Sequence, residues 1–282
     1  MELPDYNFDA IVIIGNGFDL SLGLKTSYTD FVKSKEFKLL LENENLLAKH
    51  LDGIHTLENW IDIENELKNY SKRFSRNNDN FFNEFKNLSS ALKEYLNNLK
   101  DINLNEDLMA VKIIKAVENL PTLIIDFNYT DTVSKIAEFL KFDINTKNSH
   151  IHHMKIHGSL DTNDLIFGVE DKADISSKHV FLKKSVNKNF KPIDFSEEIL
   201  TSTNFVVFGH SLGETDHMYF EDYFRKSSLS SKSRESQNIV VYYYGESSYY
   251  DLFAQIDKLT MKRVTKLKQL NEVEFYDTKN YS

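Results

Sequence analysis

Short, apolar runs rich in β-branched residues recur along the chain. The first run, Ala10–Ile14, stops at Gly15. Such runs are typical of strands buried on both faces of a parallel sheet. Because helical patterns separate several of them, the sequence predicts a Rossmann-like, doubly wound α/β fold with a mainly parallel sheet. We predict further strands at residues 122–126, 165–167, 204–208 and 239–244, and a last, edge strand at residues 273–276.

Residues 36–118 show a different pattern, with apolar residues at three- and four-residue spacing and no strand-like run. This spacing is typical of one face of an amphipathic helix. We therefore expect one α/β domain over residues 1–282, in which residues 36–118 form a helical insertion after the first strand. The insertion is expected to act as a lid or a partner surface. Its clearest helical series is Phe81, Phe82, Phe85, Leu88, Leu92, Tyr95, Leu96 and Leu99.

The composition excludes several classes of protein. A net charge of −9 disfavours broad nucleic-acid binding, because phosphate backbones repel an acidic chain. The absence of cysteine rules out disulfides and cysteine-ligated metal sites. With no signal-like N-terminal core and no apolar run of the roughly 20 residues that a membrane span needs, we expect a cytoplasmic protein without a membrane partner. The basic stretch Lys178–Lys191 is interpreted as a solvated loop or helix face.

The first candidate site is Gly15-Asn16-Gly17, at the end of the first predicted strand. Glycines let the backbone turn tightly and approach a phosphate, and a following helix points its N–H groups at an anion. The dehydrogenase fingerprint needs a third glycine where Leu20 stands and a second strand about 20 residues later, so a standard dinucleotide fold is not expected. The alternative is a tight strand–helix turn without a ligand.

The second candidate is Asn128, which follows the strand predicted at residues 122–126. Ligands in open α/β sheets bind outside the carboxyl ends of the strands. The amide of an asparagine offers a donor and an acceptor to a ribose hydroxyl or a water. The alternative, which this segment alone favours, is that Asn128 or Thr130 caps the helix predicted from Val133 onward.

Histidines cluster in the segment Ile151–Gly158. Alternation along a strand places His153, Lys155 and His157 on one face and His152 on the other. At the end of this strand, His157 would suit general base catalysis near neutral pH. A hydrogen-bonded core histidine is an alternative, and we expect no metal site because no carboxylate is adjacent.

Two further segments carry chemically active side chains. Gly209–Gly213 matches the nucleophile elbow of serine hydrolases. Those enzymes need an acid and then a histidine after the serine. The only histidine after Ser211 is His217, which is too close along the chain to arrive from a separate loop, so serine hydrolysis is the less favoured interpretation. We interpret the acidic segment Trp60–Glu66 as a solvated helix face anchored by the tryptophan. The alternative is that Glu64 reaches a ligand-binding cleft.

Together, these stretches resemble the bacteriophage abortive-infection AbiH family. The resemblance covers nearly the whole chain. It implies a role in phage defence, in which an infected cell stops growing or dies. The matching motifs, in chain order, are Ile14–Leu20, Gly23, Thr26–Phe31, Trp60–Glu64, Phe127–Thr130, Ile156–Gly158 and Gly209–Asp216.

The same order of motifs is distantly similar to the sirtuin superfamily of NAD-consuming enzymes. This similarity makes Asn128 and His157 a catalytic pair beside the nicotinamide ribose. Sirtuin deacylases carry a four-cysteine zinc module, so a chain without cysteine is not expected to deacylate proteins. The cofactor-binding residues that the similarity implies are Gly15, Asn16, Gly17, Asp19, Tyr28, Gly209, Ser211 and Asp216.

The resemblances lead to the hypothesis of an NAD+ glycohydrolase-like enzyme whose substrate is NAD+ or a related nucleotide. Asn128 would position a water or a ribose hydroxyl, and His157 would act as general base. Asp19 or Asp216 would bind the ribose or stabilise positive charge. A non-catalytic nucleotide sensor and a toxin acting on nucleic acid or translation stay open as alternatives. The helical insertion would contact a defence partner or a second copy of the chain.

Overall fold

A computed structural model shows that the chain forms two compact units, each assembled from segments that are distant in sequence. The sheet unit consists of residues 1–23, 102–156 and 193–282. The helical unit consists of residues 24–101 and 157–192. The structure describes residues 7–54, 60–74, 80–99, 102–146, 149–160, 165–190, 196–229 and 235–281.

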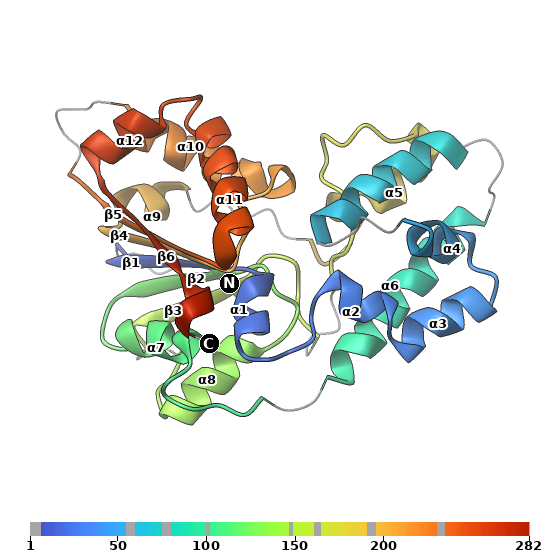
Figure 1. The fold of residues 1–282 in the computed structure, drawn as a ribbon, viewed down its shortest axis with the longest axis horizontal. Helices are drawn as coiled ribbons and strands as arrows, with labels where there is room; N and C mark the ends of the chain where they lie inside the picture. Colours follow the sequence, from blue (N-terminus) through green and yellow to red (C-terminus); the bar gives the residue numbers. More distant parts are fainter. Residues whose placement is uncertain are drawn as a thin grey trace. The chain divides into compact units, whose positions relative to one another are not determined.

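The sheet unit is built on six parallel strands (Figure 1). The strands are β1 (Ala10–Ile14), β2 (Thr122–Asp126), β3 (Ile151–Lys155), β4 (Asn204–Phe208), β5 (Asn238–Tyr243) and β6 (Glu272–Asp277). They pair in the order β3-β2-β1-β4-β5-β6, with β6 at an edge as predicted. The Rossmann-like, doubly wound α/β fold predicted from the sequence is therefore confirmed.

The direction of the strand order reverses between β1 and β4. The chain moves outward from β1 through β2 and β3, and then returns to add β4 on the other side of β1. Ile14 is in register with Asp126 of β2 and with Phe208 of β4, so these three strands end at one edge of the sheet. This is the strand order of dinucleotide-binding domains, which bind ligands at the reversal. The sequence predicted against a standard dinucleotide fold because Leu20 replaces the third glycine and because no second strand follows closely. The first segment of the helical unit is what separates β2 from β1 along the chain.

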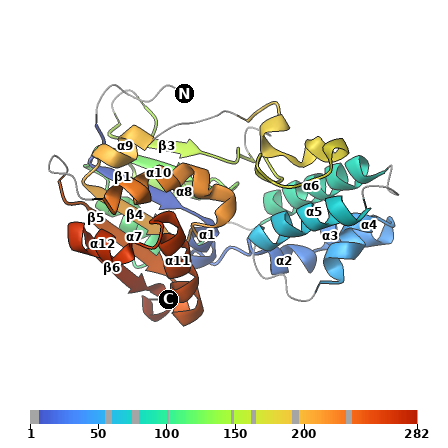
Figure 2. The same cartoon turned by 90° about the horizontal axis from the view of Figure 1, so that it is seen from above.

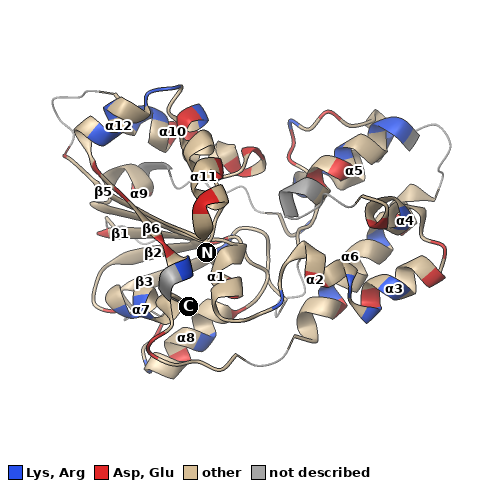
Figure 3. Ribbon diagram, viewed as in Figure 1, with Lys and Arg blue, Asp and Glu red and all other residues tan. Residues whose placement is uncertain are grey.

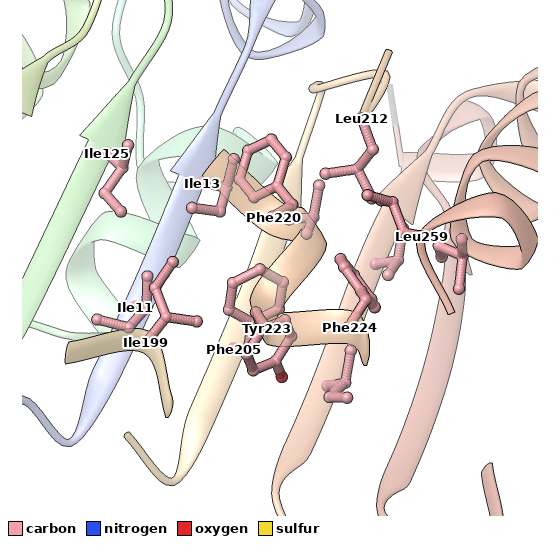
Figure 4. Close-up of a cluster of buried hydrophobic side chains, with 14 of the residues drawn as sticks. Ile11, Ile13, Ile125, Ile199, Phe205, Leu212, Phe220, Tyr223, Phe224 and Leu259 are labelled. Carbon is pink, nitrogen blue, oxygen red and sulfur yellow. The ribbon is translucent and has the colours of Figure 1, made fainter. Parts of the chain in front are cut away.

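Helices cover both faces of the sheet (Figures 1 and 2). One face carries α1 (Asn16–Ser21), α7 (Met109–Ala116) and α8 (Thr132–Leu140). The other carries α9 (Ser196–Thr201), α10 (His217–Ser227), α11 (Gly245–Leu259) and α12 (Val264–Leu270). Successive strand residues alternate between the two cores, so Ile13 packs with Phe220 of α10 (Figure 4) and Ile14 packs with Val111 of α7.

The helical unit is built on five α-helices among its described residues. They are α2 (Tyr28–Val32), α3 (Lys35–Glu42), α4 (Leu46–Asp52), α5 (Trp60–Phe74) and α6 (Phe81–Asn97), followed by the 3-10 turns η1 (Ser177–Leu182) and η2 (Lys184–Val186). Side-chain oxygens of Ser27, Ser34 and Asn45 accept backbone N–H groups at the starts of α2, α3 and α4. The predicted helical series beginning at Phe81 forms α6.

Two features of the chain differ from the predictions. The strand predicted at residues 165–167 is wrong: Phe167 stacks on Phe85 of α6 with ring centroids 5.6 Å apart, and the segment has no regular strand. A short apolar run fits a buried loop as well as a strand. The helical unit also has other boundaries than residues 36–118. The helix α7 lies outside it, because Val111 and Ile114 pack in the same core as Val12 of β1.

Acidic and basic side chains alternate along α3, whereas the described acidic side chains of α5 precede its basic ones (Figure 3). None of the described helices combines the length and the apolar character that crossing a membrane requires. The amphipathic helices instead bury their apolar faces in the cores of their own units.

Candidate functional site

The loops that follow β1 and β4 meet through three glycines. Gly15 N–H donates to Phe208 O at 3.1 Å, and Gly17 N–H donates to Gly209 O at 2.9 Å. A Cβ atom at Gly17 would lie 2.6 Å from Gly209 Cα, and one at Gly209 would lie 2.2 Å from Phe18 N. Gly209 also has a φ of +68°. The two loops thus touch backbone to backbone at the reversal of the sheet, which only glycine allows.

The loop after β4 is fixed by two buried side chains. Leu212 has a φ of +51°, and its fully buried side chain lies in the core under the loop (Figure 4). Leu212 N–H donates to His210 Nδ1 at 3.0 Å. A neutral His210 therefore carries its proton on Nε2, which lies 3.4 Å from Asp216 Oδ2. Ser211 is exposed between these anchors.

This loop does not have the geometry of a nucleophile elbow. An elbow places the serine itself in a strained turn between a strand and a helix. Here the positive φ values belong to Gly209 and Leu212, and α10 begins only at His217. His217 Nε2 lies 3.0 Å from Gln255 Oε1, on α11. The geometry therefore argues against Ser211 as the nucleophile of a serine hydrolase.

Asn128 lies at the carboxyl end of β2 and is 6% exposed. Its Nδ2 donates to Gly15 O at 3.1 Å, and its backbone N–H donates to Asp126 Oδ1 at 2.8 Å. The cap position of α8 is Asp131, which makes no side-chain cap. The alternative in which Asn128 or Thr130 caps this helix is therefore wrong. Because Gly15 O takes the Nδ2 donor, the amide of Asn128 is oriented by the glycine loop.

Asp19 lies in α1 and is 1% exposed. Thr130 Oγ1 donates to its Oδ2 at 2.5 Å, and Thr132 Oγ1 donates to its Oδ1 at 2.8 Å. Burial raises the pKa of Asp19 to about 7; the charge of Asp126 adds to the rise, while the two threonine hydroxyls and Lys155 oppose it. Both carboxylate oxygens therefore tie α1 to the start of α8. The ribose contact assigned to Asp19 stays a prediction.

Asp126 is the last residue of β2 and is fully buried. His153 Nε2 lies 2.9 Å and Lys155 Nζ 3.1 Å from its Oδ2. Burial acts to raise the pKa of Asp126, but Lys155, His153 and the Asn128 N–H together keep it below its ordinary value. Lys155 Nζ also donates to the carbonyl oxygens of Asn128 and Thr130. The prediction that His153 and Lys155 share one face of β3 is confirmed, and both fix the loop that carries Asn128.

His157 does not belong to β3, which ends at Lys155, and lies in the helical unit. Its side chain is buried, with Nε2 3.3 Å from Lys184 Nζ. Lys184 Nζ lies 2.7 Å from Glu64 Oε1. Glu64 and Lys184 are both buried. The acidic segment Trp60–Glu66 and the basic stretch Lys178–Lys191 were both interpreted as solvated. That interpretation is wrong for Glu64 and Lys184.

Tyr28 also lies in the helical unit, where it is 3% exposed in α2. Burial, and then the charges of Asp52 and Glu66, raise the pKa of its hydroxyl. The side chain of Trp60, predicted to anchor the acidic segment, is not among the side chains that the structure describes. The remaining predicted ligand-binding residues all lie in the sheet unit, and they are Gly15, Asn16, Gly17, Asp19, Asn128, Gly209, Ser211 and Asp216.

The clustered histidines are separated by the pleat of β3. His152 packs its ring against Phe8, with centroids 5.7 Å apart, whereas His153 contacts Asp126 on the other face. Within the described parts of the chain, no three His, Asp or Glu side chains are grouped so that they could hold a metal ion.

Two pairings of buried charged residues were not predicted from the sequence. Asp126 had a recognisable signal, because it ends an apolar run directly before the candidate Asn128. Glu64 was considered as an alternative cleft residue, but nothing in the sequence indicated its pairing with Lys184, since each lies in a charged stretch that is typical of a solvated surface.

A family comparison places these motifs in a known group of proteins. The model described as bacteriophage abortive infection AbiH matches residues 11–243. The chain belongs to the AbiH family. No curated protein gives a significant match. Membership of AbiH suggests a role in phage abortive infection, and the match includes both glycine loops, Asn128 and His157.

Proposed function

We propose that this AbiH-family protein binds a nucleotide at the carboxyl edge of its sheet and hydrolyses NAD+ or a related nucleotide during abortive infection. The observation that carries the proposal is the backbone contact of Gly17 with Gly209 at the reversal between β1 and β4. Doubly wound sheets bind nucleotides at this place. The sirtuin-like order of the motifs supplies the choice of NAD+ as substrate.

The reaction breaks the bond between ribose C1′ and the nicotinamide nitrogen. The bonding electron pair leaves with nicotinamide, which departs as a neutral molecule and therefore needs no acid. A water oxygen bonds to C1′ and loses one proton, which gives ADP-ribose and H+. Because the transition state resembles an oxocarbenium ion, the main tasks of the protein are to hold the ribose and to admit one water.

Asn128 is suited to hold the ribose or the water. Gly15 O fixes its Nδ2, so Oδ1 is the atom that would accept a hydrogen bond from a hydroxyl or a water. Of the two acids assigned to the ligand, Asp216 is the better placed, since its side chain is 13% exposed whereas Asp19 bonds two threonines internally. Asp216 would then stabilise the positive charge that develops on the ribose.

The experiment measures cellular NAD+ after induced expression, with and without phage infection. Wild type is expected to deplete NAD+, and Asn128→Ala and His157→Ala are expected to preserve it while their circular dichroism spectra stay unchanged. Exposed residues supply matched controls, Asn189→Ala and His150→Ala, which should deplete NAD+ like wild type. Full depletion by Asn128→Ala, or growth arrest by wild type without NAD+ loss, would contradict the proposed reaction.

A non-catalytic nucleotide sensor is the second candidate. It is favoured by Asp19 and Asp126, the carboxylates nearest the ends of β1 and β2, because both are buried and bonded within the protein. Calorimetry with NAD+ distinguishes the two functions. Binding without release of nicotinamide, in the presence of infected-cell extract, would support the sensor.

A further inference from the structure

Three polar side chains from different segments of the helical unit meet in its interior. Glu64 comes from α5, Lys184 from η2 and His157 from the segment after β3. They are 9%, 7% and 8% exposed, respectively. Lys184 Nζ stands between the other two, 2.7 Å from Glu64 Oε1 and 3.3 Å from His157 Nε2. A buried ammonium group beside a histidine ring constrains the position of the protons.

Two donors cannot face each other across a hydrogen bond, so either Lys184 or His157 presents a lone pair at this contact. The carboxylate of Glu64 lies within hydrogen-bond distance of Lys184 Nζ and favours the ammonium form of the lysine. Lys184 is therefore the donor, and His157 Nε2 is the acceptor. A neutral imidazole that accepts at Nε2 carries its proton on Nδ1.

We propose that Glu64 and Lys184 are positioning residues that hold His157 as the neutral, Nδ1-protonated tautomer. In turnover, which rests on the proposed function, His157 then acts as a hydrogen-bond donor through Nδ1–H and not as a general base through Nε2. This donor role replaces the role of general base that the sequence analysis assigned to His157. The attacking water would lose its proton to solvent after the bond to C1′ has formed.

The same unit contains a histidine of the opposite tautomer, which serves as an internal reference. Ser71 Oγ accepts the N–H of Ser176 at 3.0 Å and lies 2.9 Å from His179 Nδ1, and we infer that its hydroxyl donates to this nitrogen. A neutral His179 consequently carries its proton on Nε2. Burial lowers the pKa of His179, and Lys178 adds to that effect, which favours the neutral form at neutral pH.

The first experiment reads the tautomers directly, by two-bond ¹⁵N–¹H correlation spectra of the full chain labelled at histidine. The His157 signals are assigned by their loss in His157→Asn. In wild type we expect His157 protonated at Nδ1 only and His179 protonated at Nε2 only. Protonation of His157 at Nε2 at neutral pH would overturn the proposal, whatever the activity of the protein.

Two substitutions of Lys184 test what sets the tautomer. Lys184→Met removes the donor, and we expect His157 to shift to the Nε2-protonated tautomer that imidazole prefers in water. Lys184→Arg keeps a charged donor and should retain the Nδ1 tautomer. The signals of His179 should not change in either variant. Unchanged signals would show that the helical unit of the variant is folded. An unchanged His157 tautomer in a folded Lys184→Met would contradict the positioning role.

The second experiment separates a donor from a base in NAD+ consumption. Asparagine places an amide N–H near the position of Nδ1, whereas glutamine places one near Nε2. We expect His157→Asn to lose about tenfold in rate, comparable to one imperfect hydrogen bond. His157→Gln should lose far more. A base would make both variants slower by roughly 10²–10⁴-fold. If wild type does not consume NAD+, the proposed function fails, while the tautomer measurement still decides the positioning role.

Discussion

The contact between the two glycine loops makes a quantitative prediction for Gly209→Ala. An added Cβ would lie 2.2 Å from Phe18 N and 2.5 Å from Gly17 C, both of which are backbone atoms. A flexible side chain could move aside, but these atoms belong to the first turn of α1. The substitution must therefore separate the loops after β1 and β4 or displace α1 from the sheet.

The magnitude has two parts. Gly209 has a φ of +68°, and an L-residue in this left-handed conformation costs about 1–2 kcal/mol. Overpacking against fixed atoms adds typically about 1–3 kcal/mol. We thus expect Gly209→Ala to lower the free energy of unfolding of the sheet unit by about 2–5 kcal/mol. Gly23→Ala is a matched control, because Gly23 has a φ of +79° and nothing within 4 Å of the added Cβ.

Hydrogen exchange measured by mass spectrometry is a suitable assay, since peptides from β1 and β4 report on the sheet unit alone. Gly23→Ala should show only the conformational cost of about 1–2 kcal/mol. Gly209→Ala should lose about 1–3 kcal/mol more than Gly23→Ala in the free energy of unfolding of the sheet unit, and hydrogen exchange should increase in both β1 and β4. Equal losses in the two variants would refute the close approach of the loops, and with it the structural basis of the proposed nucleotide site.

Two further predictions concern the buried carboxylates. The pKa of Asp19 rises from 3.8 to about 7 on folding, so its contribution to stability is full below the lower value and is lost as the pH rises through the upper one. Relative to wild type, Asp19→Asn should therefore gain up to about 4 kcal/mol between about pH 4 and pH 8 in denaturant titrations; a difference independent of pH would contradict the raised pKa. Lys155→Met leaves Asp126 with His153 and the Asn128 N–H as partners and should cost about 3 kcal/mol. Adding Asp126→Asn should recover part of that loss, and strictly additive effects would show that Lys155 and Asp126 are not coupled.

Much of the sheet unit could be predicted because its signals are local. The runs at β1 and β2 are buried at every position and largely apolar, since both faces of a central parallel strand are buried. The series from Phe81 has the period of a helix that buries one side. The same reasoning failed for residues 165–167, where an apolar run is too short to distinguish a strand from a loop packed on α6.

The candidate site was predicted less well, because its chemistry depends on partners that are distant in the sequence. Asn128 was correctly singled out, but its contact with Gly15 arises only from the pairing of β1 and β2. Glu64 and Lys184 lie in charged stretches, and averages over such stretches favour solvent. Their burial follows from the assembly of the helical unit from two separate segments.

Local sequence patterns were sufficient to predict the class of fold, the helical character of the inserted region and the positions of the two glycine loops, because periodicity and backbone freedom are properties of neighbouring residues. The order of the strands, the contact between Gly17 and Gly209, and the partners of the buried charges became known from the folded chain. A buried charge is stable only beside a specific partner. Folding alone brings those partners together, so no local pattern could have identified them.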